Sequence, residues 1–318
     1  MTGNNPLVQD GPADLLAEPK IPTLDKKLVI TVATTGGFIR HEQNPAQPYY
    51  PKEIAEHVIR SYKLGAAVWH VHIRDAAGNL AREVAPIIEA ADLVLEQCPD
   101  ILLSQSGHWE VGKRGAEGVK SLVEPLLEEG ARRNRRYIHT VVINPATVSR
   151  QQMDREDVQD VVTYLLSRGI LPEFQNQDSR AIRNVQAWLI EAGILKPPYA
   201  MNLLMGYHGP RFIGCTGPDP WGHIELLTMM QMLPPGSVIG ATIGGRRWLP
   251  LTVQAVLLGA DCVRIGMEDA IWMYPHKDIK IRHCTEPVAK IAAIARELGR
   301  DIASPAEAAQ LLGCATKP

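Results

Sequence analysis

The sequence predicts a single (β/α)8 barrel, and three observations support this prediction. Eight short runs rich in β-branched residues alternate with eight helical stretches over residues 27–318. Strict alternation of this kind indicates one parallel sheet with right-handed crossovers. The number of units and the length of 318 residues suit a barrel of ~250 residues with insertions. No G-x-G-x-x-G motif follows the first run, so a doubly wound open sheet is the weaker alternative.

The order of the elements follows from the apolar patterns along the chain. The predicted strands are Leu28–Ala33, Ala67–Ile73, Ile101–Gln105, Tyr137–Ile143, Ile170–Phe174, Ala200–Met205, Ser237–Thr242 and Asp261–Gly266. The predicted helices are Pro51–Leu64, Val84–Gln97, Gly118–Glu129, Arg155–Ser167, Ser179–Ala192, Pro220–Met232, Pro250–Leu258 and Thr285–Leu298. A short terminal helix over Ser304–Gly313 is expected to cap one end of the barrel.

Proline and glycine mark the ends of several predicted helices. Pro51 precedes Glu53 in a first turn, and Pro250 lies where a missing N–H is tolerated. Glycines end four helices just before a strand, which is the usual place for a residue in the left-handed conformation. These glycines are Gly65, Gly169, Gly193 and Gly259.

Composition excludes several classes of protein. The chain has 33 Lys and Arg against 35 Asp and Glu, and this balance argues against a broad nucleic-acid surface. Its five cysteines are far apart and form no C-x-x-C pair, which excludes a disulfide scaffold and a thiolate zinc site. No apolar run reaches the ~18 residues that a membrane helix needs. We therefore expect a cytoplasmic protein that binds neither nucleic acid nor membrane.

The first 26 residues are expected to lie outside the barrel, which then comprises residues 27–318 as one catalytic domain. They are rich in Pro, Asn, Gly and acidic side chains, and they carry neither the basic start nor the apolar segment of a signal peptide. We expect this N-terminal arm to be a flexible tail or to lie against a partner subunit.

The motif Trp69-His70-Val71-His72-Ile73-Arg74-Asp75 is the strongest local signal in the sequence. Side chains alternate between the faces of a strand, so His70 and His72 point the same way. Two imidazoles one pleat apart are well placed to bind one divalent ion. They come at the end of the second predicted strand, on the side of a barrel that carries active sites. The alternative is a hydrogen-bonded pair of interior histidines, which is costly to bury without partners.

A matching set of polar residues follows the last predicted strand. Arg264, Gly266 and Glu268 share a face if that strand stays regular as far as Glu268. The eighth strand of a closed barrel pairs with the first, and the second lies just beyond. His70, His72 and Glu268 can therefore converge as a two-histidine, one-carboxylate set with open positions for a substrate. The alternative is a structural ion pair between Arg264 and the two acids at the barrel rim.

The combination of these motifs resembles the beta-keto acid cleavage enzymes, a zinc-dependent family. The resemblance runs from about Leu28 to Gly313. It rests on Thr35-Gly36-Gly37 after the first strand, HVHIRD, Gly240 to Arg246 (GATIGGR) and VRIGMED. It implies an acyltransferase that joins a β-keto acid to acetyl-CoA and releases acetoacetate and a new acyl-CoA. It also implies a homo-oligomer.

The resemblance assigns roles to residues of this chain. It implies that the zinc ligands are His70, His72 and Glu268. Asp269, oriented by Arg264, is expected to be the base that forms an acetyl-CoA enolate. Ser106 matches a serine that hydrogen-bonds the substrate, although a turn serine beside Gly107 is the alternative. The positions expected around the substrate are Thr35, Phe38, Gly107, Asn144, Glu173 and Gln175.

Three positions depart from the family pattern. Phe38 stands where the founding member has a glutamate that recognises an amino group, so we predict a substrate with an uncharged or apolar tail. Arg40 nearby would instead favour an acidic tail. Gln175 replaces an acid and cannot ionise. Either Glu173 supplies that charge or the network has one charge fewer, and we expect Glu173 to face opposite to Gln175. A family Ser or Thr falls at Val142, with Asn144 nearby.

CoA has no compact motif in this sequence. Its phosphates need cations or N–H donors, and Arg246, Arg247 and the amides of Gly206–Gly217 are the candidates. Two other functions stay open at this point. One is a metal-dependent aldolase or decarboxylase that needs no acetyl-CoA. The other is a metal-binding barrel without catalytic activity.

Overall fold

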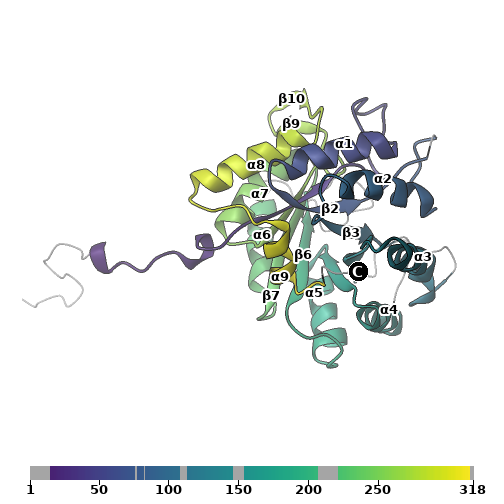
Figure 1. Ribbon diagram of the computed structural model, residues 1–318. Helices are drawn as coiled ribbons and strands as arrows, with labels where there is room; N and C mark the ends of the chain where they lie inside the picture. The colour runs from purple at the N-terminus through teal and green to yellow at the C-terminus, as the bar shows by residue number, and fades with distance from the viewer. Residues whose placement is uncertain are drawn as a thin grey trace, which may run out of the picture.

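The computed structural model is a closed eight-stranded barrel with helices around it (Figure 1). It describes residues 15–75, 77–81, 83–107, 113–145, 154–206 and 221–315. The strands follow one another around the barrel in chain order, and each pairs in parallel with its neighbours, including β1 with β8. The prediction of a (β/α)8 barrel is confirmed.

Each strand lies within a few residues of the apolar run that predicted it. The strands are β1 Val29–Ala33, β2 Ala66–Val71, β3 Leu102–Ser106, β4 Thr140–Ile143, β5 Leu171–Asn176, β6 Tyr199–Met205, β7 Ser237–Ile243 and β8 Cys262–Ile265. Trp69 and Val71 of β2 face the helices and are fully buried there, whereas His70 between them faces the inside of the barrel. The side chains of β2 that face outward therefore belong to the core, whereas the inward-facing His70 belongs to the candidate site.

The helices occupy the predicted positions. They are α1 Pro51–Tyr62, α2 Ala85–Leu95, α3 Glu117–Arg133, α4 Arg155–Ser167, α5 Ser179–Val185, α6 Trp221–Gln231, α7 Trp248–Leu257 and α8 Thr285–Glu297. A π-helical turn, Gln186–Ile190, continues α5, and 3-10 turns lie at Leu15–Ala17, Pro22–Leu24 and Gly245–Arg247. The four glycines expected at helix ends all have positive φ angles.

The predicted terminal helix is α9, Pro305–Leu312. Ser304 caps it, because its hydroxyl accepts a hydrogen bond from the Glu307 amide while Glu307 accepts one from the Ser304 amide. Leu312 and Ala308 pack against Val29, Val68 and Leu102 at the amino-terminal end of the strands. This helix closes the end of the barrel opposite to the candidate site.

A small antiparallel hairpin was not predicted from the sequence. Its strands are β9 Trp272–Tyr274 and β10 Lys277–Lys280, and it lies between β8 and α8. The strands have three and four residues and a mixed polar pattern, so no apolar alternation identified them. The hairpin extends the loop that follows Glu268 and Asp269.

The segment before β1 leaves the barrel in an extended path, at the left of Figure 1. The first 14 residues of the predicted arm lie outside the described residues. Leu16 is fully exposed, whereas Lys26 contacts the Asp261 carboxylate at 2.5 Å, where the arm joins the barrel. Among the helices that the structure describes, none is both long and apolar enough to cross a membrane.

Candidate active site

Three candidate metal ligands meet at the carboxyl-terminal end of β1. Ala33 of β1 pairs with His70 of β2, and the Ala33 carbonyl accepts a hydrogen bond from the Glu268 amide at 3.2 Å. The Glu268 carboxylate therefore lies 3.8 Å from His70 Nε2 and 3.5 Å from His72 Nε2. All three side chains are buried. Their donor atoms lie within 4.8 Å of one another, close enough to share one ion.

Glycine allows the turn after β8 to approach β1 this closely. The strand ends at Ile265, so the condition for a shared face, a regular strand as far as Glu268, is not met. Gly266 has a φ of +155°, and a Cβ atom there would lie 1.9 Å from the Ala33 carbonyl oxygen. Only a residue without a side chain can occupy this position. The turn, rather than strand periodicity, brings Glu268 towards the histidines.

Arg264 organises the acids of this turn. Its guanidinium donates hydrogen bonds to Asp269 at 3.0 and 2.6 Å and to Glu268 at 3.0 Å. All three side chains are buried. Two neighbouring carboxylates are costly to bury when both are ionised. Burial, opposed by Arg264 and reinforced by Asp269, raises the pKa of Glu268 to about 8.

The donor set is suited to a divalent cation. Glu268 Oε2 is buried, and it accepts no hydrogen bond from any residue that the structure describes. This oxygen is the one that faces His70 Nε2. Two imidazoles and a carboxylate form a facial set of the kind that leaves other metal positions open. A cation there would satisfy this oxygen.

A chain of hydrogen bonds inside the barrel supports His70. Its Nδ1 lies 3.5 Å from the Ser104 hydroxyl, which donates to Glu173 Oε2 at 2.9 Å. Glu173 also accepts from the Thr140 hydroxyl at 3.2 Å and from Asn202 Nδ2 at 3.0 Å. Because the hydroxyl proton points at Glu173, Ser104 can accept a proton from Nδ1. That tautomer leaves the Nε2 lone pair of His70 facing Glu268.

Glu173 therefore lies deeper in the barrel than the strand ends. It lines a cavity of about 30 Å³ together with Thr140, Asn202 and Arg264. Glu173 and Gln175 face the same side of β5, because residues two apart on a strand share a face and Phe174 between them is fully buried on the other. The expectation that they face opposite ways was wrong. Gln175 is one pleat nearer to the carboxyl-terminal end.

The turn after β1 is held by Arg74. Its guanidinium donates to the Thr35 hydroxyl at 3.1 Å, to the Ile39 carbonyl at 2.6 Å and to the Gly36 carbonyl. Gln47 also donates to the Thr35 hydroxyl, at 3.1 Å. Thr35 thus organises the backbone at the site. Phe38, in the same turn, is 43% exposed.

The remaining predicted residues lie at the same end of the barrel, but Arg246 contacts a neighbouring hairpin there. Ser106 ends β3, Gly107 follows it, and Asn144 follows β4, which pairs with β3 there. Arg246 instead contacts the β9–β10 hairpin: it pairs with Asp278 and lies over the Trp272 ring at 4.4 Å. Arg247 ends the same 3-10 turn. Residues 207–217 of the candidate CoA loop lie outside the described residues.

Three residues that support the site were not predicted from the sequence. Arg74 belongs to the HVHIRD motif but was given no role, and Ser104 and Asn202 were not singled out. The alternation of β3 places Ser104 on the same face as Ser106, which is the signal that would have identified it.

The fold and the site together define a class of protein, a (β/α)8 barrel with a buried two-histidine, one-carboxylate set beside an arginine–aspartate pair. The sequence profile described as beta-keto acid cleavage enzyme matches residues 27–314. The chain belongs to this family.

Relatives with assigned activities cover most of the chain. It is 27% identical over 289 residues to 3-keto-5-aminohexanoate cleavage enzyme of Acetoanaerobium sticklandii, covering 91% of this chain and 98% of the relative. It is 25% identical to 3,5-dioxohexanoate:acetyl-CoA acetone transferase of Paraburkholderia graminis, covering 90% and 96%. It is 24% identical to 3-oxoadipate:acetyl-CoA acetyltransferase of Cupriavidus necator, covering 90% and 94%. Among solved structures, apo ObcA superposes with a TM-score of 0.67 at 19% identity, covering 85% of this chain and 66% of ObcA, a likeness of fold.

Proposed function

We propose that this protein is a zinc-dependent acyltransferase that cleaves a β-keto acid with acetyl-CoA as co-substrate. The observation that carries the proposal is the convergence of His70, His72 and Glu268 beside the buried pair of Arg264 and Asp269. Relatives of matching length whose names specify acetyl-CoA as a reactant support the co-substrate. We expect a cytoplasmic homo-oligomer.

The residues around the proposed ion are arranged to receive a β-keto acid. A bound divalent cation supplies Lewis acidity towards the ketone and carboxylate oxygens of the substrate. His70, His72 and Glu268 would hold this ion, and a set of three protein ligands leaves metal positions open for a substrate. Ser104 and Glu173 hold His70 in the tautomer that such binding needs.

The products determine which carbon reacts. Acetoacetate contains the acetyl group of acetyl-CoA joined to C1 and C2 of the β-keto acid. C2 must therefore form a bond to the thioester carbonyl carbon, and the bond between C2 and C3 must break. The carbanion forms at C2 of the β-keto acid, and this balance corrects the expectation of an acetyl-CoA enolate. The released CoA thiolate attacks C3, which becomes the carbonyl carbon of the new acyl-CoA.

Asp269 is the proposed base for C2. Two hydrogen bonds from Arg264 fix the plane and position of its carboxylate, so little reorganisation is needed when it takes the proton. The same proton returns to C2 of acetoacetate after the C2–C3 bond has broken. Arg264 is a positioning residue in this scheme, and the carboxylate of Asp269 is the catalytic group.

The mouth of the barrel sets the proposed preference for the tail of the substrate. Phe38 is 43% exposed in the turn beside Glu268, and an aromatic ring cannot pair with an ammonium group as a carboxylate does. We expect an uncharged or apolar tail. Arg40, which would favour an acidic tail, is exposed and contacts Asn79 at 3.4 Å. Arg246 and Arg247 are the proposed contacts for the CoA phosphates, and Arg246 also pairs with Asp278.

A screen of β-keto acids with acetyl-CoA and zinc, read as acetoacetate, tests the proposed function. We expect acetoacetate with at least one substrate, and its formation is expected to require acetyl-CoA. Uncharged or apolar tails should give the highest kcat/KM. Decarboxylation or aldol cleavage that yields no acetoacetate with any substrate of the panel would reject the proposed reaction. A clear preference for an amino-substituted tail would reject the role of Phe38.

A further inference from the structure

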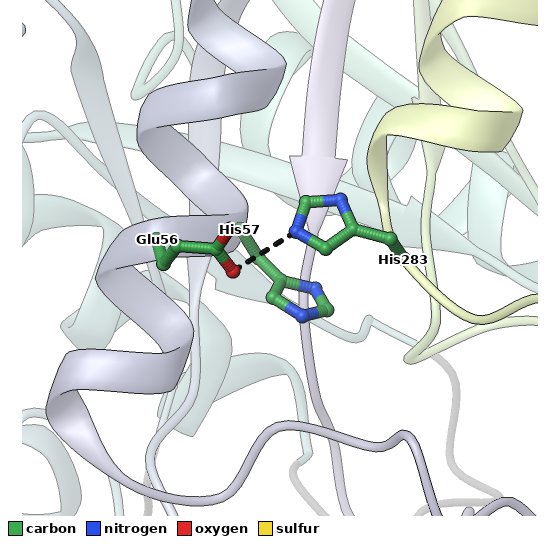
Figure 2. A group of neighbouring side chains, drawn as sticks. All are labelled: Glu56, His57 and His283. Atoms are coloured by element: carbon green, nitrogen blue, oxygen red, sulfur yellow. Dashed lines mark hydrogen bonds and ion pairs between the residues drawn. The ribbon is translucent and has the colours of Figure 1, made fainter.

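A second cluster of metal-binding side chains lies on the outside of the barrel. Glu56 and His57 belong to α1, and His283 precedes α8. Figure 2 shows the Glu56 carboxylate on α1 and the His283 ring from the segment before α8 pointing at one another, with the His57 ring beside them. We infer that Glu56, His57 and His283 form a second site for a transition-metal ion such as Zn²⁺ or Co²⁺.

The distances within this cluster suit a single ion. One donor atom from each residue lies within 4.8 Å of the others, and His283 Nε2 lies 3.1 Å from Glu56 Oε2. Ligands at ~2.0–2.1 Å from a tetrahedral ion are about 3.3 Å apart, so this pair is already at ligand spacing. The centroids of the two imidazole rings are 3.7 Å apart and the rings are tilted by 33°. The His283 side chain is partly exposed, so we expect its ring to rotate on binding and to bring a nitrogen of each imidazole to one ion.

The Glu56 carboxylate is directed at the place of the proposed ion. The hydrogen bond between His283 Nε2 and Glu56 Oε2 occupies the place of the ion. An ion that binds there would displace the proton of this hydrogen bond. Arg60 binds the other oxygen, Glu56 Oε1, at 2.8 Å and leaves Oε2 directed at His283.

Neighbouring groups can orient both imidazoles. His283 Nδ1 accepts a hydrogen bond from the Thr285 amide at 3.1 Å and lies 2.8 Å from the Thr285 hydroxyl, and these contacts hold its Nε2 towards Glu56. His57 Nδ1 accepts a hydrogen bond from the Cys284 amide at 3.4 Å and lies 3.4 Å from the Cys284 thiol. Glu56 is about half exposed, so water can complete the coordination and the ion can enter from solvent. Two imidazoles and one carboxylate select zinc-like ions over calcium or magnesium.

The position of this site in the fold gives it a structural consequence. The helices α1 and α8 follow the first and the last strand of the barrel, and those strands pair to close it. An ion between the helices would join the two ends of the barrel. Because it binds the folded chain, it would raise the thermal midpoint of unfolding.

Counting zinc ions on the full-length protein tests this inference. We expect two ions per chain after zinc loading and gel filtration, and one ion on the double variant Glu56→Gln/His283→Asn. His276→Asn is the matched control: it removes a histidine of the nearby hairpin that belongs to no described metal cluster, and it should retain two. The same zinc content in wild type and in the double variant would overturn the inference.

A second variant separates this site from the proposed catalytic one. His70→Ala/His72→Ala should retain one ion per chain, and zinc should still raise its Tm. The addition of His283→Asn should abolish that rise. If zinc raises Tm equally with and without His283, the second site is wrong, whatever happens at the first. If wild type carries one ion that depends on His283 alone, the second site stands and the proposed catalytic one fails.

Discussion

Replacing Gly36 by alanine adds one methyl group directly beside the Glu268 side chain. A Cβ atom there would lie 2.3 Å from Glu268 Cγ and 2.7 Å from Oε1. Carbon atoms pack at about 3.5–4.0 Å, so the Glu268 side chain must move by about 1 Å. It is buried and held by Arg264, and movement in that direction takes its carboxylate out of the set shared with His70 and His72.

The expected effect of Gly36→Ala is a loss of zinc affinity and activity with the fold retained. A displacement of about 1 Å at a reacting centre lowers the rate by about 10²-fold, and comparable disturbance of ligand geometry lowers metal affinity by about 10–100-fold. Chelator competition measures the affinity, and acetoacetate formation measures kcat/KM.

Gly37→Ala is the matched control, because its Cβ atom would lie 3.3 Å from Leu80 Cδ1 and away from Glu268. We expect its zinc affinity and kcat/KM to stay near those of wild type. A Gly36→Ala protein with wild-type zinc affinity and activity would refute the assignment of Glu268 as a metal ligand.

Three further predictions concern Asp269, Ser104 and the buried His139. Asp269→Asn should lower kcat by about 10²–10⁴-fold, as expected for loss of a general base, with unchanged zinc content; an active variant would exclude Asp269 as the base. Ser104→Ala should weaken zinc binding by about 10–100-fold because His70 loses its support, whereas equal affinity would show that Ser104 does not orient His70. Burial, reinforced by Arg136, lowers the pKa of His139 to about 3. Between about pH 6.5 and 3 the unfolded chain then binds more protons than the folded chain. The free energy of unfolding therefore decreases as the pH is lowered through that range. In His139→Gln, the loss of unfolding free energy from pH 7 to 5 should be smaller by about 2 kcal/mol; an unchanged slope in urea titrations would contradict this.

The sequence was informative wherever one segment determines its own structure. Apolar runs such as Leu28–Ala33 predicted their strands, here β1 Val29–Ala33, because a buried parallel strand needs little else. Gly65 and Gly169 marked helix ends because they adopt positive φ angles. The β9–β10 hairpin was missed because its short strands are half exposed and carry no apolar period.

The site could be predicted only as far as strand periodicity extends. His70 and His72 followed from alternation, whereas the close approach of Glu268 depends on a turn at Gly266 whose fit against Ala33 involves a segment more than 200 residues away. The support of His70 by Ser104 and Glu173 joins side chains 34 and 69 residues apart. Such contacts depend on barrel register and stagger, which residue pattern does not specify.

Isotope tracing with doubly ¹³C-labelled acetyl groups tests the proposed reaction most directly. With [1,2-¹³C₂]acetyl-CoA and an unlabelled β-keto acid, bond formation at C2 predicts acetoacetate that is two mass units heavier, with the label at C3 and C4. The new acyl-CoA should carry no label. Unlabelled acetoacetate, or label in the acyl-CoA, would contradict transfer of the acetyl group to C2 and with it the chemistry assigned to this barrel.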